Sequence, residues 1–121
     1  MKPKIVKANG LKEALTPERC FIAENYSADD ISVAQARVKP GVTTVAHRVG
    51  VNEIYLIIKG RGQVEVGDMP STKVSLGDLI VIPAGTSQRI TNIGKNDLLF
   101  YCICTPKFTQ DSYVDEEASE R

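Results

Sequence analysis

The chain contains a single histidine, His47, and a carboxylate that lies six residues further on, Glu53, is placed to work with it. Glu53 opens the strand that returns after a turn, so its carboxylate can meet the imidazole ring across a β-hairpin. A buried carboxylate requires a partner, which here is the protonated ring, a metal ion or the hydroxyl of Tyr55. One imidazole excludes every metal or catalytic site that needs two from the same subunit. We therefore expect His47 and Glu53 to be pocket residues.

The other candidate pocket residues follow from the alternation of side chains along β-strands. Besides His47 and Glu53, alternation places on inward faces Val49, Tyr55, Ile57, Gln88, Ile90, Phe100 and Cys102. Cys102 and Cys104 share one face of the last predicted strand, and we expect both to pack as small hydrophobes. The alternative is a thiol that faces the pocket as a soft ligand or an oxidation target.

Short segments rich in Val, Ile, Thr and aromatic residues predict an all-β fold that positions these side chains. The predicted strands include Ile31–Val38, Val42–Val49, Glu53–Lys59, Gln63–Val66, Val74–Leu76, Leu79–Ile82, Gln88–Thr91 and Leu98–Thr105. Turn residues separate them at intervals of about 8–12 residues, which is typical of an antiparallel sandwich or barrel. Residues 10–16 predict a short helical turn before the first strand.

The length of 121 residues predicts one domain, because domains usually contain about 100–200 residues. We expect an N-terminal arm over residues 1–18, a β-barrel domain over 19–108 and a C-terminal tail over 109–121. The tail contains five acidic residues among its last eleven, so we expect it to be mobile.

The charges balance, with 15 basic and 15 acidic residues, which argues against nucleic acid or an anionic membrane as the main partner. The basic N-terminus leads into no long apolar stretch of the signal-peptide kind, and no segment is long enough to span a bilayer. Three cysteines are an odd number and predict no disulfide framework. We expect a cytoplasmic protein.

Two segments combine glycines, a proline and polar residues at fixed spacings. The first contains Gly41, His47, Val49, Glu53 and Gly60, and the second contains Gly77, Pro83, Gly85, Gln88 and Asn92. This pattern resembles the paired motifs of the cupin superfamily, and the chain looks like a small single-domain bacterial or archaeal cupin. The resemblance covers roughly residues 31–105. It implies a jelly-roll barrel, also called a double-stranded β-helix, around one metal ion held by three histidines and a glutamate.

Two of the four ligand positions differ from the family pattern, because Val49 and Gln88 replace histidines. The resemblance then implies a degenerate metal site of His47, Glu53 and Gln88, with water in the open positions. Imidazole suits Zn, Fe, Ni and Cu, whereas carboxylate and carbonyl oxygen suit harder ions such as Mn. We expect a single divalent ion, Mn, Fe, Ni, Co or Zn, bound more weakly than by the full set.

Two functions from different classes remain. The first is a metal-dependent cupin enzyme that acts on a small organic or sugar-like molecule by isomerisation, epimerisation, decarboxylation or dioxygenation, as the resemblance implies. The second is a non-catalytic cupin that binds or senses a small ligand with weak or no metal, which Val49 favours. The apolar segment Ile5–Ala8 and the outward residues Leu99, Tyr101 and Ile103 also predict a homodimer.

Overall fold

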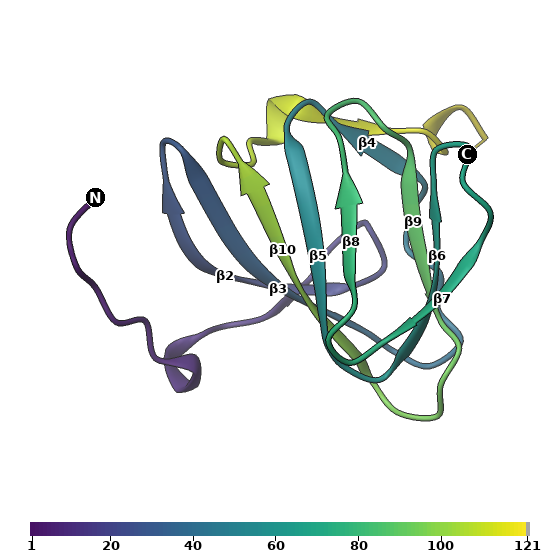
Figure 1. Cartoon of the computed structure of the whole chain (residues 1–121), viewed down its shortest axis with the longest axis horizontal. Helices are drawn as coiled ribbons and strands as arrows, with labels where there is room; N and C mark the ends of the chain where they lie inside the picture. The colour runs from purple at the N-terminus through teal and green to yellow at the C-terminus, as the bar shows by residue number, and fades with distance from the viewer. Residues whose placement is uncertain (121) are drawn as a thin grey trace.

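The computed structural model describes residues 1–120 and consists of two antiparallel β-sheets that face each other as a jelly-roll barrel (Figure 1). The six-stranded sheet contains, in spatial order, β1 (Ala14–Leu15), β2 (Phe21–Ala28), β3 (Ile31–Val38), β10 (Leu98–Thr105), β5 (Asn52–Lys59) and β8 (Leu79–Ile82). The five-stranded sheet contains β11 (Tyr113–Asp115), β4 (His47–Val49), β9 (Gln88–Asn92), β6 (Arg61–Val66) and β7 (Thr72–Ser75). The predicted all-β class and barrel architecture are confirmed.

The strand that carries His47 is shorter than predicted. The sequence predicts Val42–Val49, whereas β4 contains only His47–Val49. The preceding residues follow an irregular path because their backbone amides bond to several different segments. The Thr44 N–H donates to the Ile90 carbonyl at 2.9 Å, and the Val45 N–H donates to the Glu18 carbonyl at 3.2 Å. These bonds still hold the segment beside β9 and the N-terminal region.

The N-terminal region also differs from expectation. Residues 10–16 were expected to form a helical turn, but the 3₁₀ turn lies at Ala8–Gly10, and Ala14–Leu15 forms β1 against β2. A hydrogen bond from the Thr16 N–H to the Cys20 carbonyl, at 2.9 Å, closes the turn between the two strands. Arg19 in this turn has φ +68°, and its guanidinium bonds to the Thr43 carbonyl at 2.9 Å. These bonds favour an extended arm over a helix.

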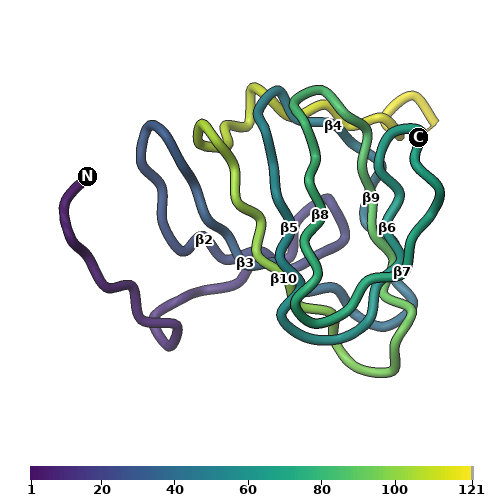
Figure 2. Tube along the Cα trace, viewed as in Figure 1, coloured from purple at the N-terminus to yellow at the C-terminus, as the bar shows by residue number. Residues whose placement is uncertain are grey.

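The C-terminal segment lies along the barrel, whereas the N-terminal arm runs away from it (Figure 2). We expected the segment to be mobile, but β11 pairs antiparallel with β4. Its acidic residue Glu117 accepts two hydrogen bonds from the barrel side. The Ala46 N–H donates to its carboxylate at 2.6 Å, and Arg19 donates to the same carboxylate at 3.1 Å. The charge that suggested mobility instead attaches the segment to the barrel. Two further short 3₁₀ turns cover Gln110–Ser112, before β11, and Ala118–Glu120, after it.

Alternation along β5 divides its side chains between the two faces of the sheet, as predicted. Tyr55 and Ile57 are buried at 3% and 0% exposure, and the intervening residues of the strand are only partly buried. The inward side chains join a core cluster that includes Val38, Ile90 and Leu98. Among residues 1–120, no helix is long and apolar enough to cross a membrane.

Candidate functional site

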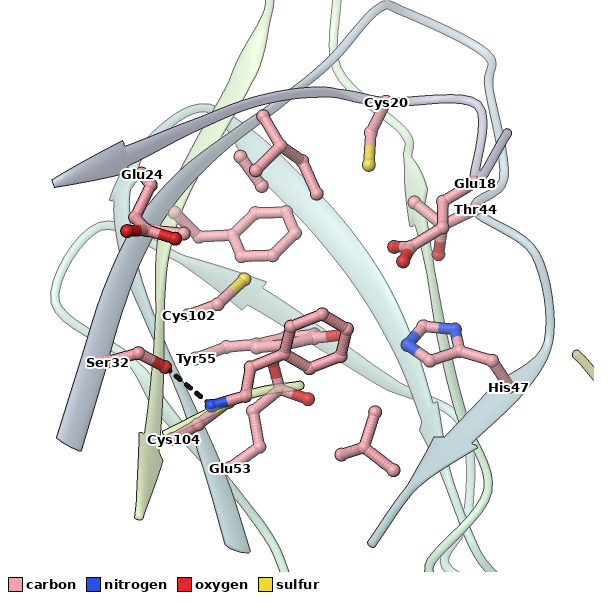
Figure 3. A pocket seen from close by; sticks show the side chains of 16 residues that line it. Glu18, Cys20, Glu24, Ser32, Thr44, His47, Glu53, Tyr55, Cys102 and Cys104 are labelled. Carbon is pink, nitrogen blue, oxygen red and sulfur yellow. Dashed lines mark hydrogen bonds between the residues drawn. The ribbon is translucent and has the colours of Figure 1, made fainter. Parts of the chain in front are cut away.

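A cavity of about 200 Å³ opens between the two sheets and contains most of the candidate pocket residues (Figure 3). Of the nine predicted residues, those that line it are His47, Val49, Glu53, Tyr55, Phe100 and Cys102. The volume equals roughly six or seven water molecules, since each occupies about 30 Å³ in the liquid. The cavity therefore suits a small molecule rather than a polymer.

The other three predicted residues lie outside the cavity wall. Ile57 and Ile90 are fully buried in the core cluster, so they support the barrel rather than line the cavity. Gln88 is 1% exposed and lies opposite His47 on the neighbouring strand β9. Its amide oxygen accepts a hydrogen bond from the hydroxyl of Tyr55, while its Nε2 has no partner among the described residues.

His47 is held so that one ring nitrogen is free for chemistry. Its Nδ1 lies 2.6 Å from the Val45 carbonyl oxygen, which can only accept, so Nδ1 carries the hydrogen. In the neutral ring Nε2 is then the proton acceptor. The ring stacks on Tyr113 of β11, with centroids 5.1 Å apart and planes inclined by 24°. The imidazole, which is 4% exposed, therefore has a defined orientation.

Glu53 lies in the opposite sheet. We expected its carboxylate to meet His47 across a hairpin, but β5 pairs with β10 and β8, whereas β4 pairs with β9 and β11. The two residues therefore line one cavity from facing sheets. Glu53 is 7% exposed, and its Oε1 has no hydrogen-bond partner in the described part of the chain. Burial raises the pKa of Glu53, an effect that the Gln88 amide and the nearby His47 oppose in part.

Residues 34–104 match the protein family described as the Cupin domain. The chain belongs to the cupin family. A relative from Methanocaldococcus jannaschii, the uncharacterized protein MJ1618, is 33% identical over 113 residues. That similarity covers 92% of this cupin and 85% of the relative. The family that the two glycine-containing motifs indicated is thereby confirmed.

Solved structures share the fold at low sequence identity. KdgF from Halomonas sp. superposes with a TM-score of 0.81 at 15% identity, covering 91% of this cupin and 98% of KdgF. Pac13 from Streptomyces, described as a unique nucleoside dehydratase, has a TM-score of 0.77 at 11% identity, with coverage of 94% and 91%. At these identities the similarity establishes the barrel of this cupin and leaves its chemistry to its own residues.

Sequence reasoning missed several residues of the cavity wall, of which the most polar are Glu18 and Glu24. Glu18 precedes β2, and Cys20, Ile22 and Glu24 line the cavity at every second position. That two-residue period was visible in the sequence and would have placed the three side chains on one face. Phe108, which follows β10, adds an aromatic ring to the cavity wall, and no sequence pattern predicted this position.

The three cysteines of this cupin all line the cavity as free thiols. Burial raises the pKa of both Cys20 and Cys104 to about 12, and the pKa of Cys102 also lies well above its usual range because of burial. The thiols are therefore protonated near neutral pH, and a protonated thiol is a poor nucleophile and metal ligand. This favours the expected role as small apolar side chains.

The donor set fits a resident divalent ion poorly. Among residues 1–120, no three His, Cys, Asp or Glu side chains are grouped closely enough to hold a metal. Val49 lines the cavity with a hydrocarbon side chain where the family pattern has a histidine. The oxygen of Gln88 already accepts from Tyr55. What remains is His47 and Glu53, which is fewer than the three protein ligands usual at catalytic zinc sites.

The raised pKa of Glu53 predicts how stability depends on pH. The folded chain holds this proton to higher pH than the unfolded chain, so the carboxyl group stabilises the fold most below its ordinary value of 4.5. That contribution is lost as pH rises through the raised value. In urea titrations, the unfolding free energy of Glu53→Gln relative to wild type should therefore increase from about pH 4 to about pH 8.

Glu65 provides a control with the opposite sign. Its hydrogen bond to Arg89, at 2.7 Å, lowers the pKa of Glu65. This carboxylate therefore stabilises the fold above its ordinary value, and the contribution is lost on acidification. Glu65→Gln should show a small relative gain toward acid pH. A flat difference for Glu53→Gln would contradict the burial of its charge.

Proposed function

We propose that this cupin acts on a small organic or sugar-like molecule by acid–base chemistry between His47 and Glu53, without a resident metal. The observation that carries the proposal is a free Nε2 on one wall of the cavity and an unpartnered, buried carboxyl oxygen on the other. A proton acceptor and a proton donor on facing walls are what isomerisation or epimerisation requires.

The two groups differ in environment in the way that such a pair needs. Burial raises the pKa of Glu53, which favours its protonated form and so its action as a proton donor. His47 donates its Nδ1 hydrogen to the Val45 carbonyl, which leaves Nε2 to accept a proton. A substrate carbon or hydroxyl between them would lose a proton to His47 and gain one from Glu53. Tyr55, whose hydroxyl is engaged by Gln88, positions the amide beside Glu53.

The relatives support a small ligand. Pac13 is described as a nucleoside dehydratase, and the barrel of this cupin superposes on it over most of both chains. The cavity volume of about 200 Å³ is compatible with one sugar ring. We therefore propose that the ligand of this cupin resembles a nucleoside in being small and polar.

The test is hydrogen–deuterium exchange at carbon, measured by proton NMR in D₂O with a chelator present. The probes are glucose, mannose, xylose and glucosamine. Wild type should exchange a carbon-bound hydrogen of at least one probe, and His47→Asn should slow it by about 100-fold or more. The asparagine amide can replace the bond to Val45 while Nε2 is lost. Lys73→Gln, an exposed change in β7, is the control and should exchange normally.

Two results would overturn this mechanism. Exchange that appears only after Mn²⁺, Fe²⁺, Ni²⁺, Co²⁺ or Zn²⁺ is added would restore the metal-dependent enzyme that the resemblance implies. Binding of a sugar with no exchange at any carbon would identify a ligand-binding or sensing cupin. Val49 favours that second candidate, because this buried residue, 3% exposed, has an apolar side chain at a position where the family has a metal-binding histidine.

We also propose that the protein is a cytoplasmic homodimer. Leu99, Tyr101 and Ile103 lie on the outer face of the six-stranded sheet, as predicted, and are partly buried. At the edge of the same sheet, Leu79 and Val81 are 61% and 66% exposed. Such an apolar face favours the pairing of two copies. A sedimentation mass of one subunit at micromolar concentration would contradict the dimer.

A further inference from the structure

The ionisable side chains that line the cavity are mostly acidic. The carboxyl groups of Glu18, Glu24 and Glu53 face it, and the only basic side chain in the described lining is the imidazole of His47. Neither Lys nor Arg is among the described residues that line this cavity. A ligand that carries a carboxylate or a phosphate would therefore meet repulsion without a cationic partner.

Three arginines of the barrel form ion pairs away from the cavity. Arg37 pairs with Glu13 at 2.6 Å, Arg48 with Glu116 at 3.2 Å and Arg89 with Glu65 at 2.7 Å. The three carboxyl groups of the cavity form no ion pair among the described residues. These three arginines thus neutralise acids outside the cavity, and no Lys or Arg neutralises the acidic residues that line it.

Glu53 adds an independent sign of a ligand. Only 7% of Glu53 is exposed, yet its Oε1 has no hydrogen-bond partner among the described residues. An unpaired buried carboxyl oxygen is unfavourable unless another group satisfies it. In Figure 3 the carboxyl groups of Glu18 and Glu53 both extend into the space beside His47, and Glu24 lies across the cavity from His47.

The rest of the wall suits the body of a small cation. Phe100 packs on Tyr55 with ring centroids 4.6 Å apart, and both rings line the cavity together with Phe108. Aromatic faces attract ammonium groups as well as hydrocarbon. Ser32 and Thr44 add hydroxyl groups for a polar ligand.

We propose that the cavity selects a small ligand with a protonated amine on a polar body, of the amino sugar class, that Glu18 recognises the ammonium group, and that Glu24, on the opposite side, adds to the negative charge of the cavity. This inference rests on the proposed function and specifies its substrate class. Burial raises the pKa of Glu18, an effect that the nearby His47 opposes, and an ammonium group beside Glu18 favours its ionised form. Glu53 and His47 then remain available for the proton transfers.

The test compares three probes that share one ring: glucosamine, glucose and glucuronate. Their affinities for wild-type protein are measured by titration calorimetry at low salt, with a chelator present throughout. We expect glucosamine to bind about tenfold tighter than glucose or more, and glucuronate to bind weakest. The glucosamine preference should shrink as salt is added.

Variants assign the preference to residues. Glu18→Gln should weaken glucosamine binding by about tenfold and leave glucose nearly unchanged. Glu24→Lys changes an exposed residue, so the fold should tolerate it, and it should improve glucuronate relative to glucosamine. Asp68→Asn, in the exposed turn after β6, makes the same charge change as Glu18→Gln away from the cavity wall and should alter neither affinity.

Equal affinity for glucosamine and glucose, a preference for glucuronate, or no glucosamine binding at about 10 mM would each overturn the inference. These results are distinguishable from failure of the proposed function. Carbon exchange on glucose with no preference for the amine would retain the acid–base mechanism and refute this ligand class. Selective binding of glucosamine with no exchange in D₂O would retain the ligand class and refute the mechanism.

Discussion

Gly60→Ala should destabilise the protein by about 4 kcal/mol or more, at the upper end of single-substitution effects. Gly60 lies between β5 and β6 with φ +89°, where side-chained residues are strained. A Cβ atom there would lie 2.6 Å from the Asp97 carbonyl oxygen and 3.0 Å from the Leu98 Cα. Both neighbours are backbone, so neither can rotate away. Urea unfolding followed by circular dichroism measures the loss.

Gly77→Ala separates the two causes. Gly77 has φ +90°, almost the same as Gly60, but a Cβ atom there would meet nothing within 4 Å. It should lose only the conformational penalty of about 1–2 kcal/mol. If the Gly60→Ala variant is insoluble and the Gly77→Ala variant is soluble, that result would also agree with this difference. Equal losses in the two variants would show that the turn at Gly60 yields and that the close approach to Asp97 carries no weight.

Asn92→Asp should destabilise the protein by about 2–5 kcal/mol at neutral pH, although it changes the side-chain volume very little. Asn92 is 1% exposed, and its Nδ2 donates to the carbonyls of Val38 and Asn96 at 2.9 and 2.8 Å. Its Oδ1 accepts from the Gly94 N–H at 2.9 Å. The aspartate keeps the last bond but turns an acceptor, with a charge, toward two carbonyl oxygens.

The pH dependence of this variant identifies the cause. The buried carboxyl group would hold its proton to higher pH in the folded state, so the loss should be smaller near pH 4 than near pH 8. Asn96→Asp makes the same chemical change at an exposed side chain and should stay within about 0.5 kcal/mol of wild type. If Asn92→Asp is as mild as this control, the three hydrogen bonds do not stabilise the turn.

The sequence was sufficient for the strands whose residues alternate and whose ends carry turn residues. Ile31–Val38, Leu79–Ile82 and Leu98–Thr105 form strands with the predicted bounds, and Tyr55 is buried as alternation required. Asn92 was recognisable as part of the second motif. Its structural role, which is to join a turn to β3, depends on contacts that no local pattern contains.

The relation between His47 and Glu53 was beyond local reasoning. Their proximity in the sequence suggested neighbouring strands of one sheet, but the chain crosses between the sheets from β4 to β5. Which strands pair is decided by burial of both faces over the whole barrel, and six residues of sequence do not encode it. The same limit applies to the C-terminal segment, because acidic composition is typical of a mobile tail until Arg19 and the Ala46 amide are placed beside it.

The stack of Tyr113 on His47 bears on how such proteins diverge. The family match ends at residue 104, and it begins at residue 34, after Glu18 and Glu24. The ring that orients the imidazole and two of the acidic residues of the cavity therefore lie outside the part of the chain that matches the family. Two cupins that share the residues of the family match can consequently differ in ligand because of the 33 residues before it and the 17 after it.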